Sequence, residues 1–198
     1  MNPERFAVLI SGRGSNLKAI LDYWETQDPG SHTQRSTPAL VISNRPEAPG
    51  LQFARDRGLP HVVVDHTQYQ EREHFDDALT TCLEEHDISW VILAGFMRVL
   101  GPGFVSRYSG RILNTHPSLL PAFPGRDAMG QALAAGVKIS GCTVHRVDGG
   151  VDTGPIVAQA AVPVYPDDDD KRLGERIRSA EHHLYPRVIA QVIAEALP

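Results

Sequence analysis

Short, continuous apolar runs alternate along the chain with stretches in which apolar residues recur every three or four positions. The first pattern predicts buried strands and the second predicts amphipathic helices. Strands that are apolar throughout and separated by helices are typical of a parallel sheet covered on both faces. The predicted strands are 6–10, 39–42, 61–64, 91–94 and 111–113, and the predicted helices lie around 17–24, 51–58 and 75–83.

The pattern changes after Pro121. It predicts a helix at 128–135, strands at 137–147 and 155–164, and a closing helix at 173–197. The two late strands are too close together for a helical crossover, so we expect at least one to be antiparallel. The predicted fold class is therefore α/β, a doubly wound, mostly parallel sheet with antiparallel strands near the C-terminus. We expect a single domain over 1–198, with a polar loop at 28–38.

Composition narrows the range of partners. The chain has 198 residues, 41% of them hydrophobic, which is enough for one globular domain with a proper core. A formal charge of −5 argues against a broad nucleic-acid interface but leaves room for a small anionic ligand. The longest apolar run, 90–97, is far short of the roughly 20 residues that a membrane-spanning helix needs. The N-terminus lacks the features of a signal peptide, so we expect a cytoplasmic protein without a membrane partner.

Two features that suggest a metal or a disulfide have simpler interpretations. Cys82 and Cys142 are widely spaced and match no zinc-ligand pattern, so we expect two buried thiols and no metal. The four aspartates at 167–170 precede the closing helix, where carboxylates cap free amides and complement the helix dipole. A metal site at these aspartates is the alternative interpretation.

The stretch 113–121, Leu-Asn-Thr-His-Pro-Ser-Leu-Leu-Pro, carries the clearest chemical pattern. Asn114 offers a neutral amide donor, and His116 exchanges protons near neutral pH. In an extended chain residues i and i+2 face the same side, so the two side chains can address one reacting atom. Such a pair suits a transition state that gathers negative charge on oxygen and needs a proton moved. An ordinary strand end with a His-Pro turn is the alternative.

A glycine-rich loop, Ser-Gly-Arg-Gly-Ser-Asn at 11–16, follows the first strand and precedes a helix. Its free amides, the Ser15 hydroxyl and the Asn16 amide predict an anion site that favours a phosphate. The loop matches neither the dinucleotide-binding pattern nor a Walker sequence. A turn required by geometry alone is the alternative.

Two further loops follow predicted strands. The apolar stretch 94–100 suits a flat heterocycle, although a buried corner of the core would have the same composition. Asp152 lies on a glycine-rich loop, where its carboxylate can favour the imidazolium form of a histidine or form an Asx turn. Because binding sites in open parallel sheets lie beyond the carboxyl ends of the strands, we expect these loops to share one cleft.

Four segments, 10–16, 93–98, 113–121 and 152–155, together resemble the phosphoribosylglycinamide formyltransferase family, the folate-dependent glycinamide ribonucleotide transformylases. The Asn-x-His pair with a distant Asp is shared across folate formyl hydrolases and transferases. The 11–16 loop is the feature that resembles the glycinamide ribonucleotide transformylases in particular. The resemblance implies a Rossmann-like fold and transfer of a formyl group from 10-formyltetrahydrofolate to the amine of glycinamide ribonucleotide. This reaction belongs to purine (IMP) biosynthesis. Folate acts in it as cosubstrate, and no metal is needed.

The resemblance also implies residue roles. Asn114 and a protonated His116 would stabilise an oxyanion, while Asp152 keeps His116 charged. The residues implied for the ribonucleotide are Gly14, Ser15, Asn16 and Glu181. Those implied for folate are Arg72, Met97, Arg98, Val99, Leu100, Asn114, Asp148, Gly149, Gly150, Val151 and Asp152. Small-molecule substrates are the expected partners, and the oligomeric state, monomer or homodimer, stays open.

Other functions remain as alternatives. A 10-formyltetrahydrofolate deformylase would use the same three polar residues with water as acceptor, but such relatives carry an extra N-terminal domain. A methionyl-tRNA formyltransferase would need a further C-terminal domain and a more basic surface. A non-catalytic nucleotide-sensing module would have no use for Asn114, His116 and Asp152 together. Measurable formyl transfer would separate these classes.

Overall fold

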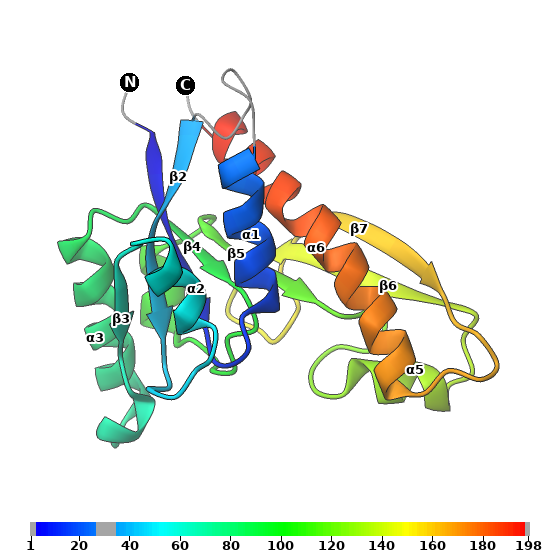
Figure 1. Cartoon of the computed structure of the whole chain (residues 1–198). Coiled ribbons are helices and arrows are strands. Elements are labelled where there is room, and N and C mark those ends of the chain that lie inside the picture. Colours follow the sequence, from blue (N-terminus) through cyan, green and yellow to red (C-terminus); the bar gives the residue numbers. More distant parts are fainter. Residues whose placement is uncertain (1–2, 27–34, 197–198) are drawn as a thin grey trace.

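The computed structural model describes residues 3–26 and 35–196, and within them the chain forms one seven-stranded sheet of order β3-β2-β1-β4-β5-β6-β7 (Figure 1). Strands β1 to β5 are parallel, whereas β6 runs antiparallel to β5 and β7 antiparallel to β6. This arrangement confirms the predicted fold class. The strands are β1 (Glu4–Ile10), β2 (Ser36–Ser43), β3 (His61–Val63), β4 (Trp90–Leu93), β5 (Ile112–His116), β6 (Ile139–Arg146) and β7 (Ile156–Pro163).

Helices cover both faces of the parallel part of the sheet. Helices α1, α2 and α6 pack on one face, where Figure 1 shows α1 and α6 side by side, and α3 and α4 pack on the other. A 3-10 turn, His66–Gln68, precedes α3. The helices are α1 (Ser15–Thr26), α2 (Leu51–Asp56), α3 (Arg72–Glu85), α4 (Pro102–Arg107), α5 (Ala128–Ala134) and α6 (Asp170–Glu195).

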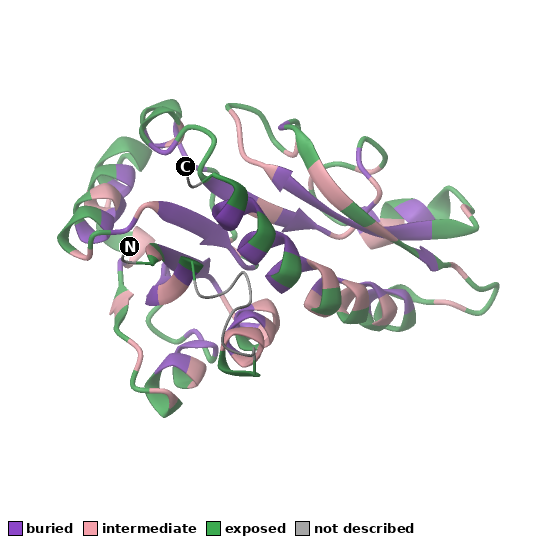
Figure 2. Ribbon diagram, turned by 90° about the horizontal axis from the view of Figure 1, so that it is seen from above, coloured by how far each residue is buried: buried purple, intermediate pink, exposed green. Residues whose placement is uncertain are grey.

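Burial on both faces explains why β1 is apolar from Phe6 to Ile10. In β1, Phe6, Val8 and Ile10 point toward α1 and α6, while Ala7 and Leu9 point toward α3. All five side chains are fully buried, and each large one stabilises the fold by roughly 1.5–3 kcal/mol relative to an exposed position. Figure 2 shows the same result for the central strands, which are buried between helices whose outer sides are exposed, whereas the edge strands β3 and β7 are largely exposed or half-buried.

Two boundaries differ from the sequence prediction in ways that matter. Strand β2 already begins at Ser36 because it pairs there with Glu4 of β1, so the predicted polar loop at 28–38 is wrong for its last three residues. Residues 28–34 of that loop lie outside the described residues, as does Leu197 at the end of the predicted closing helix. Strand β5 extends to His116 rather than ending at Leu113, because β6 supplies an antiparallel partner for residues 113–116.

Helix α4 was not predicted. It has six residues and begins with Pro102 in its first turn, a position where the missing N–H and the fixed φ of proline are tolerated. The other predicted elements agree with the structure to within a few residues at each end. No helix within 3–26 and 35–196 has the length and apolar character needed to cross a membrane.

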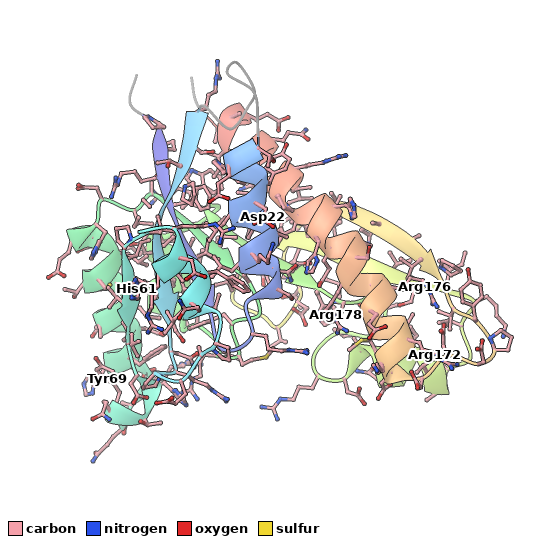
Figure 3. All side chains as sticks on the ribbon, viewed as in Figure 1. Asp22, His61, Tyr69, Arg172, Arg176 and Arg178 are labelled. Carbon is pink, nitrogen blue, oxygen red and sulfur yellow. The ribbon has the colours of Figure 1, made fainter. Side chains whose placement is uncertain are left out.

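The start of α6 confirms the simple interpretation of the acidic run 167–170. Asp169 caps the helix by accepting a hydrogen bond from the Arg172 backbone N–H at 2.8 Å. Asp168 pairs with the Arg176 guanidinium at 2.8 and 2.9 Å, and these hydrogen bonds lower the pKa of Asp168 to about 2. Figure 3 labels both arginines on α6, on the side of the helix that faces this loop. The aspartates therefore organise the turn into α6.

The order in which the chain adds parallel strands reverses between β1 and β4: β2 and β3 lie on one side of this point, and β5 lies on the other. Open sheets form ligand crevices at such a switch point. Helix α6 is fixed beside this point by Tyr185. The Tyr185 hydroxyl lies 3.0 Å from the carbonyl oxygen of Leu93, the last residue of β4, and 2.9 Å from that of Leu113, the second residue of β5. A buried tyrosine needs such acceptors. The two contacts therefore fix α6 against β4 and β5.

Candidate active site

Pairing between β5 and β6 assembles the first part of the site. Asn114 lies opposite His145, and the Asn114 Nδ2 is 3.1 Å from the His145 Nε2. The His145 Nδ1 is 2.9 Å from the Arg146 carbonyl oxygen, which can only accept, so Nδ1 carries the hydrogen and Nε2 of the neutral ring accepts from Asn114. One N–H of the Asn114 amide is used in this way, and the second remains available.

Asp152 lies between the two histidines. Its Oδ2 is 3.2 Å from the His116 Nδ1 and accepts a hydrogen bond from the Gly125 backbone N–H at 2.9 Å. Its Oδ1 is 3.5 Å from the His145 Nε2, which is too long for a good hydrogen bond and leaves Asn114 as the closer partner of His145. Only 11% of the Asp152 side chain and 7% of the His116 side chain are exposed, so little water weakens their interaction.

Both ring nitrogens of His116 face hydrogen-bond acceptors. Nε2 is 2.8 Å from the Phe123 carbonyl oxygen, and Nδ1 faces the Asp152 carboxylate. Both contacts are attractive only when both nitrogens carry hydrogen, so the geometry favours the imidazolium form. The predicted meeting of His116 and Asp152 is present in the structure. The Asx turn considered for Asp152 forms instead at Asp148. The Asp148 Oδ1 accepts hydrogen bonds from the Gly150 N–H and the Thr153 hydroxyl.

The glycine-rich loop 11–16 requires glycine at Gly14. Its φ of +71° lies in the left-handed region, and a Cβ at this position would come within 2.8 Å of the Gly50 Cα. The Gly50 N–H donates to the Gly12 carbonyl oxygen at 2.9 Å and holds the loop in place. Helix α1 starts at Ser15, with no acidic residue in its first turn, so its free amides can receive an anion.

Glu181 connects this loop to β5. The Asn16 Nδ2 donates to the Glu181 Oε2 at 3.3 Å, and the Thr115 hydroxyl donates to Oε1 at 3.1 Å. Burial raises the pKa of the Glu181 carboxyl, and the hydrogen bonds from Asn16 and Thr115 partly offset that rise. The Asn16 Oδ1 is buried without a partner among the described atoms. The structure thus brings together all four residues implied for the ribonucleotide, Gly14, Ser15, Asn16 and Glu181.

The loop after β4 presents apolar side chains to solvent. Met97 is 73% exposed and Val99 58% exposed, although both belong to a segment bordered by buried residues. Val151, on the loop after β6, is 54% exposed as well. Exposed apolar side chains on two neighbouring loops favour a binding surface over a corner of the core, which was the alternative for 94–100. Leu100 is buried in the core cluster that contains the apolar side chains of α3, and it anchors the end of this loop there.

Arg72 lies at the start of α3, close to the end of the loop after β4. Its Nε would be 3.4 Å from a Cβ placed on Gly101, so it borders the residues implied for folate. The Ser11 hydroxyl accepts from the Met97 N–H at 2.7 Å and donates to the Asn44 Oδ1 at 2.6 Å. Ser11 thereby joins the glycine-rich loop to the loop after β4. The roles of Arg72 and of the other implied folate residues remain predictions.

Sequence reasoning missed His145, Thr115 and the Phe123 carbonyl. The antiparallel register of β5 and β6 would have indicated His145, because it places residue 145 opposite Asn114. Thr115 alternates with Asn114 and His116 along β5 and therefore faces the other side, toward Glu181. No local pattern identifies the Phe123 carbonyl. It depends on a loop in which Phe123 itself has a φ of +55°.

Two surface cavities lie elsewhere. One of about 290 Å³ is lined by Glu4, Ser109, Arg111 and neighbours at the amino ends of the strands. The other, about 430 Å³, lies between β7 and α6. Neither is lined by Asn114, His116, Asp152 or a residue of the glycine-rich loop. Within the described ranges, no group of three or more His, Cys, Asp or Glu side chains is arranged to hold a metal ion.

Comparison with known proteins gives a consistent result. The profile described as "Formyl transferase" matches residues 4–189. A phosphoribosylglycinamide formyltransferase of Bacillus subtilis is 40% identical over 190 residues, covering 96% of this chain and 95% of that protein. The crystal structure of glycinamide ribonucleotide transformylase 1 from Symbiobacterium toebii superposes with a TM-score of 0.91 at 45% identity, covering 100% of this chain and 91% of that one.

Longer relatives also match. The trifunctional purine biosynthetic protein adenosine-3 of Drosophila melanogaster is 50% identical over 190 residues, which are 96% of this chain. The chain spans only 14% of the length of that relative.

Proposed function

The chain belongs to the formyl transferase family, and from this membership we propose that it transfers the formyl group of 10-formyltetrahydrofolate to the amine of glycinamide ribonucleotide in purine biosynthesis. The Bacillus subtilis and Symbiobacterium toebii proteins, which are close to this chain in length, carry names for that activity. One observation carries the proposal: β5 presents Asn114 and His116 beside Asp152, and presents Thr115 to the Glu181–Asn16 pair of the glycine-rich loop. An acid–base group and an anion site therefore meet at the carboxyl end of β5.

The glycine-rich loop receives the phosphate of the ribonucleotide. The free amides at the start of α1 and the Ser15 hydroxyl donate to the phosphate oxygens. Glu181 is buried at the junction between this loop and β5, where it accepts hydrogen bonds from the glycinamide end of the substrate in addition to those from Asn16 and Thr115. Two ends of the ribonucleotide are thus fixed, and its amine is directed toward Asn114.

The folate rests on the loop after β4 and on the 148–152 loop. The exposed side chains of Met97, Val99 and Val151 supply the apolar contact, and the backbone groups between them supply hydrogen bonds. Arg72 borders the outer end of this surface, where a cation suits the carboxylates of the folate tail. The donor brings an activated formyl group, so no metal is required by this scheme.

Catalysis follows from the positions of Asn114, His116 and Asp152. As the amine attacks the formyl carbon, negative charge develops on the formyl oxygen, and the free N–H of Asn114 donates to it. The His116 imidazolium supplies positive charge beside that oxygen, and Asp152 holds the ring charged and oriented. Donation by the His116 Nε2 itself requires the Phe123 carbonyl to move away. The amine loses one proton and the departing folate nitrogen gains one, a transfer that Asp152 assists through ordered water.

Small-molecule substrates are the partners in this proposal. A cytoplasmic location, a single domain over 1–198 and a monomeric or homodimeric state remain predictions. Sedimentation of the purified protein would measure the oligomeric state.

The unphosphorylated glycinamide riboside is expected to be a much poorer acceptor than the ribonucleotide. Several hydrogen bonds to a charged phosphate, each worth roughly 1.5–3 kcal/mol, would be lost. We expect kcat/KM for the riboside to be lower by about 10²-fold or more, measured as formylated product. Ser15→Ala and Asn16→Ala should raise the KM for the ribonucleotide while leaving the KM for folate unchanged.

Ser109→Ala is the matched control for these variants, because Ser109 is exposed and borders the cavity at the amino ends of the strands. It should change neither KM. Equal kcat/KM values for the riboside and the ribonucleotide would contradict the phosphate site.

A further inference from the structure

A buried carboxylate on α3 contacts the loop after β4, and none of the roles given above includes it. Asp76 is only 5% exposed, and its Oδ2 accepts a hydrogen bond from the Gly101 backbone N–H at 2.7 Å. Its Oδ1 is also buried and has no hydrogen-bond partner among the described atoms. Burial is the main reason that the pKa of Asp76 is raised, so placing the carboxyl here has a cost. The contact with Gly101 is the structural role that the residue performs.

The same turn of α3 supports the rest of the loop. The Phe75 ring stacks on the Phe96 ring, with centroids 6.5 Å apart and planes 13° apart, and the Arg98 guanidinium carbon lies 6.0 Å from the Phe75 ring centroid. Residues 96 and 98 are thus held by Phe75, and residue 101 is held by Asp76. The segment between these contacts carries the exposed side chains of Met97 and Val99. Helix α3 therefore fixes both ends of the 97–99 segment, which is the part of the loop after β4 assigned to folate.

Gly101 and Asp76 are fitted closely to each other. A Cβ on Gly101 would lie 2.6 Å from the Asp76 Oδ2, which is closer than such atoms approach. The φ of Gly101 is −77°, a value open to any L-residue, so glycine is needed here for space and not for backbone conformation. Any side chain at position 101 must displace the carboxylate or the loop.

We propose that Asp76 is a positioning residue for the donor site, where its carboxylate fixes the Gly101 N–H and thereby the exposed apolar segment 97–99 on which the folate rests. The inference rests on the proposed function, because it assigns that loop to folate. Asp76 does not touch the reacting atoms. Its loss should weaken folate binding and leave the chemical step and the ribonucleotide site intact.

Three variants at neighbouring positions test this role. Asp76→Ala should raise the KM for 10-formyltetrahydrofolate by about tenfold or more, while kcat and the KM for the ribonucleotide stay within about threefold. Asp76→Asn keeps an oxygen that accepts from Gly101 and should restore the KM to within about threefold of the unmodified protein. Asp77→Ala is the matched control, because Asp77 is exposed on the same helix turn. If Asp76 had a merely structural role, Asp76→Ala would instead lower the melting temperature and change kcat and both KM values together.

A double-mutant cycle tests the contact itself. Gly101→Ala should raise the KM for folate in the unmodified protein, because the new Cβ collides with the carboxylate. The same substitution should add little in the Asp76→Ala background, where the collision is absent. The inference would be overturned if the rise in the folate KM of the double variant equalled the product of the two single rises. An unchanged folate KM in Asp76→Ala would also overturn it.

Amide hydrogen exchange over residues 96–101 of the ligand-free protein separates this inference from the proposed function. Exchange there should be faster in Asp76→Ala and unchanged in Asp77→Ala, whether or not the protein transfers formyl groups. Unchanged exchange in Asp76→Ala would overturn the positioning role even in an active enzyme. Absence of transfer by the unmodified protein, with the exchange difference present, would count against the proposed function alone.

Discussion

His116→Ala and Asp152→Asn are each expected to lower kcat by about 10²–10⁴-fold, the range for loss of acid–base help. The Asp152 Oδ2 faces the His116 Nδ1 at 3.2 Å, and the Phe123 carbonyl fixes the other ring nitrogen. An asparagine at 152 keeps the shape but removes the negative charge that stabilises the imidazolium. The KM for the ribonucleotide should stay within a few-fold, because neither side chain contacts the glycine-rich loop. Steady-state kinetics at saturating folate measures both constants.

The double variant should be little worse than the more damaging single one, because the two residues act as one unit. A loss equal to the product of the two single losses would contradict the pairing. Asp87→Asn is a close control for Asp152→Asn. Asp87 has a φ of +52°, against +55° for Asp152, but it is exposed. His183→Ala, on the exposed side of α6, serves the same purpose for His116.

Asn114→Ala is expected to lower kcat by about 10²–10³-fold, the usual effect of losing one oxyanion donor. The free amide N–H of Asn114 is oriented by its other hydrogen bond, to the His145 Nε2 at 3.1 Å. Asn114→Asp should be at least as damaging, because a carboxylate of the same size only accepts hydrogen bonds and adds negative charge near the oxyanion. The measurement is kcat with both substrates saturating.

Thermal unfolding of the Asn114 variants provides the control for folding, since Asn114→Ala also leaves His145 without its donor. A melting temperature within a few degrees of the unmodified protein, together with the large loss in kcat, supports the oxyanion role. A loss in kcat below tenfold in both Asn114 variants would contradict it.

The parallel half of the sheet could be predicted from the sequence because its central strands, β1 from Phe6 onward and β4, are buried on both faces and are therefore continuously apolar. The i, i+2 spacing of Asn114 and His116 was informative for a similar reason, since alternation is a local property of an extended chain. Features that depend on distant pairing could not be predicted in this way. The extension of β5 to His116 and the position of His145 both require the antiparallel partner β6.

Loop geometry set the other limit on prediction. Ser36 to Pro38 form strand because β1 pairs with them, although their composition is that of a polar loop. The Phe123 carbonyl reaches His116 from a loop in which two residues other than glycine, Phe123 and Asp127, have positive φ. The Asp76–Gly101 contact likewise joins two elements that no sequence motif connects. Local patterns identified the strands and the polar groups, and tertiary contacts decided their partners.

The most direct test of the proposed reaction follows the formyl group in purified protein supplied with 10-formyltetrahydrofolate, with and without glycinamide ribonucleotide. Formate and formylated ribonucleotide are measured in the same reaction. We expect negligible folate turnover without the ribonucleotide, and on its addition one formylated ribonucleotide for each tetrahydrofolate released. Rapid formate release in the absence of the ribonucleotide would contradict the formyl transfer and would indicate a 10-formyltetrahydrofolate deformylase instead.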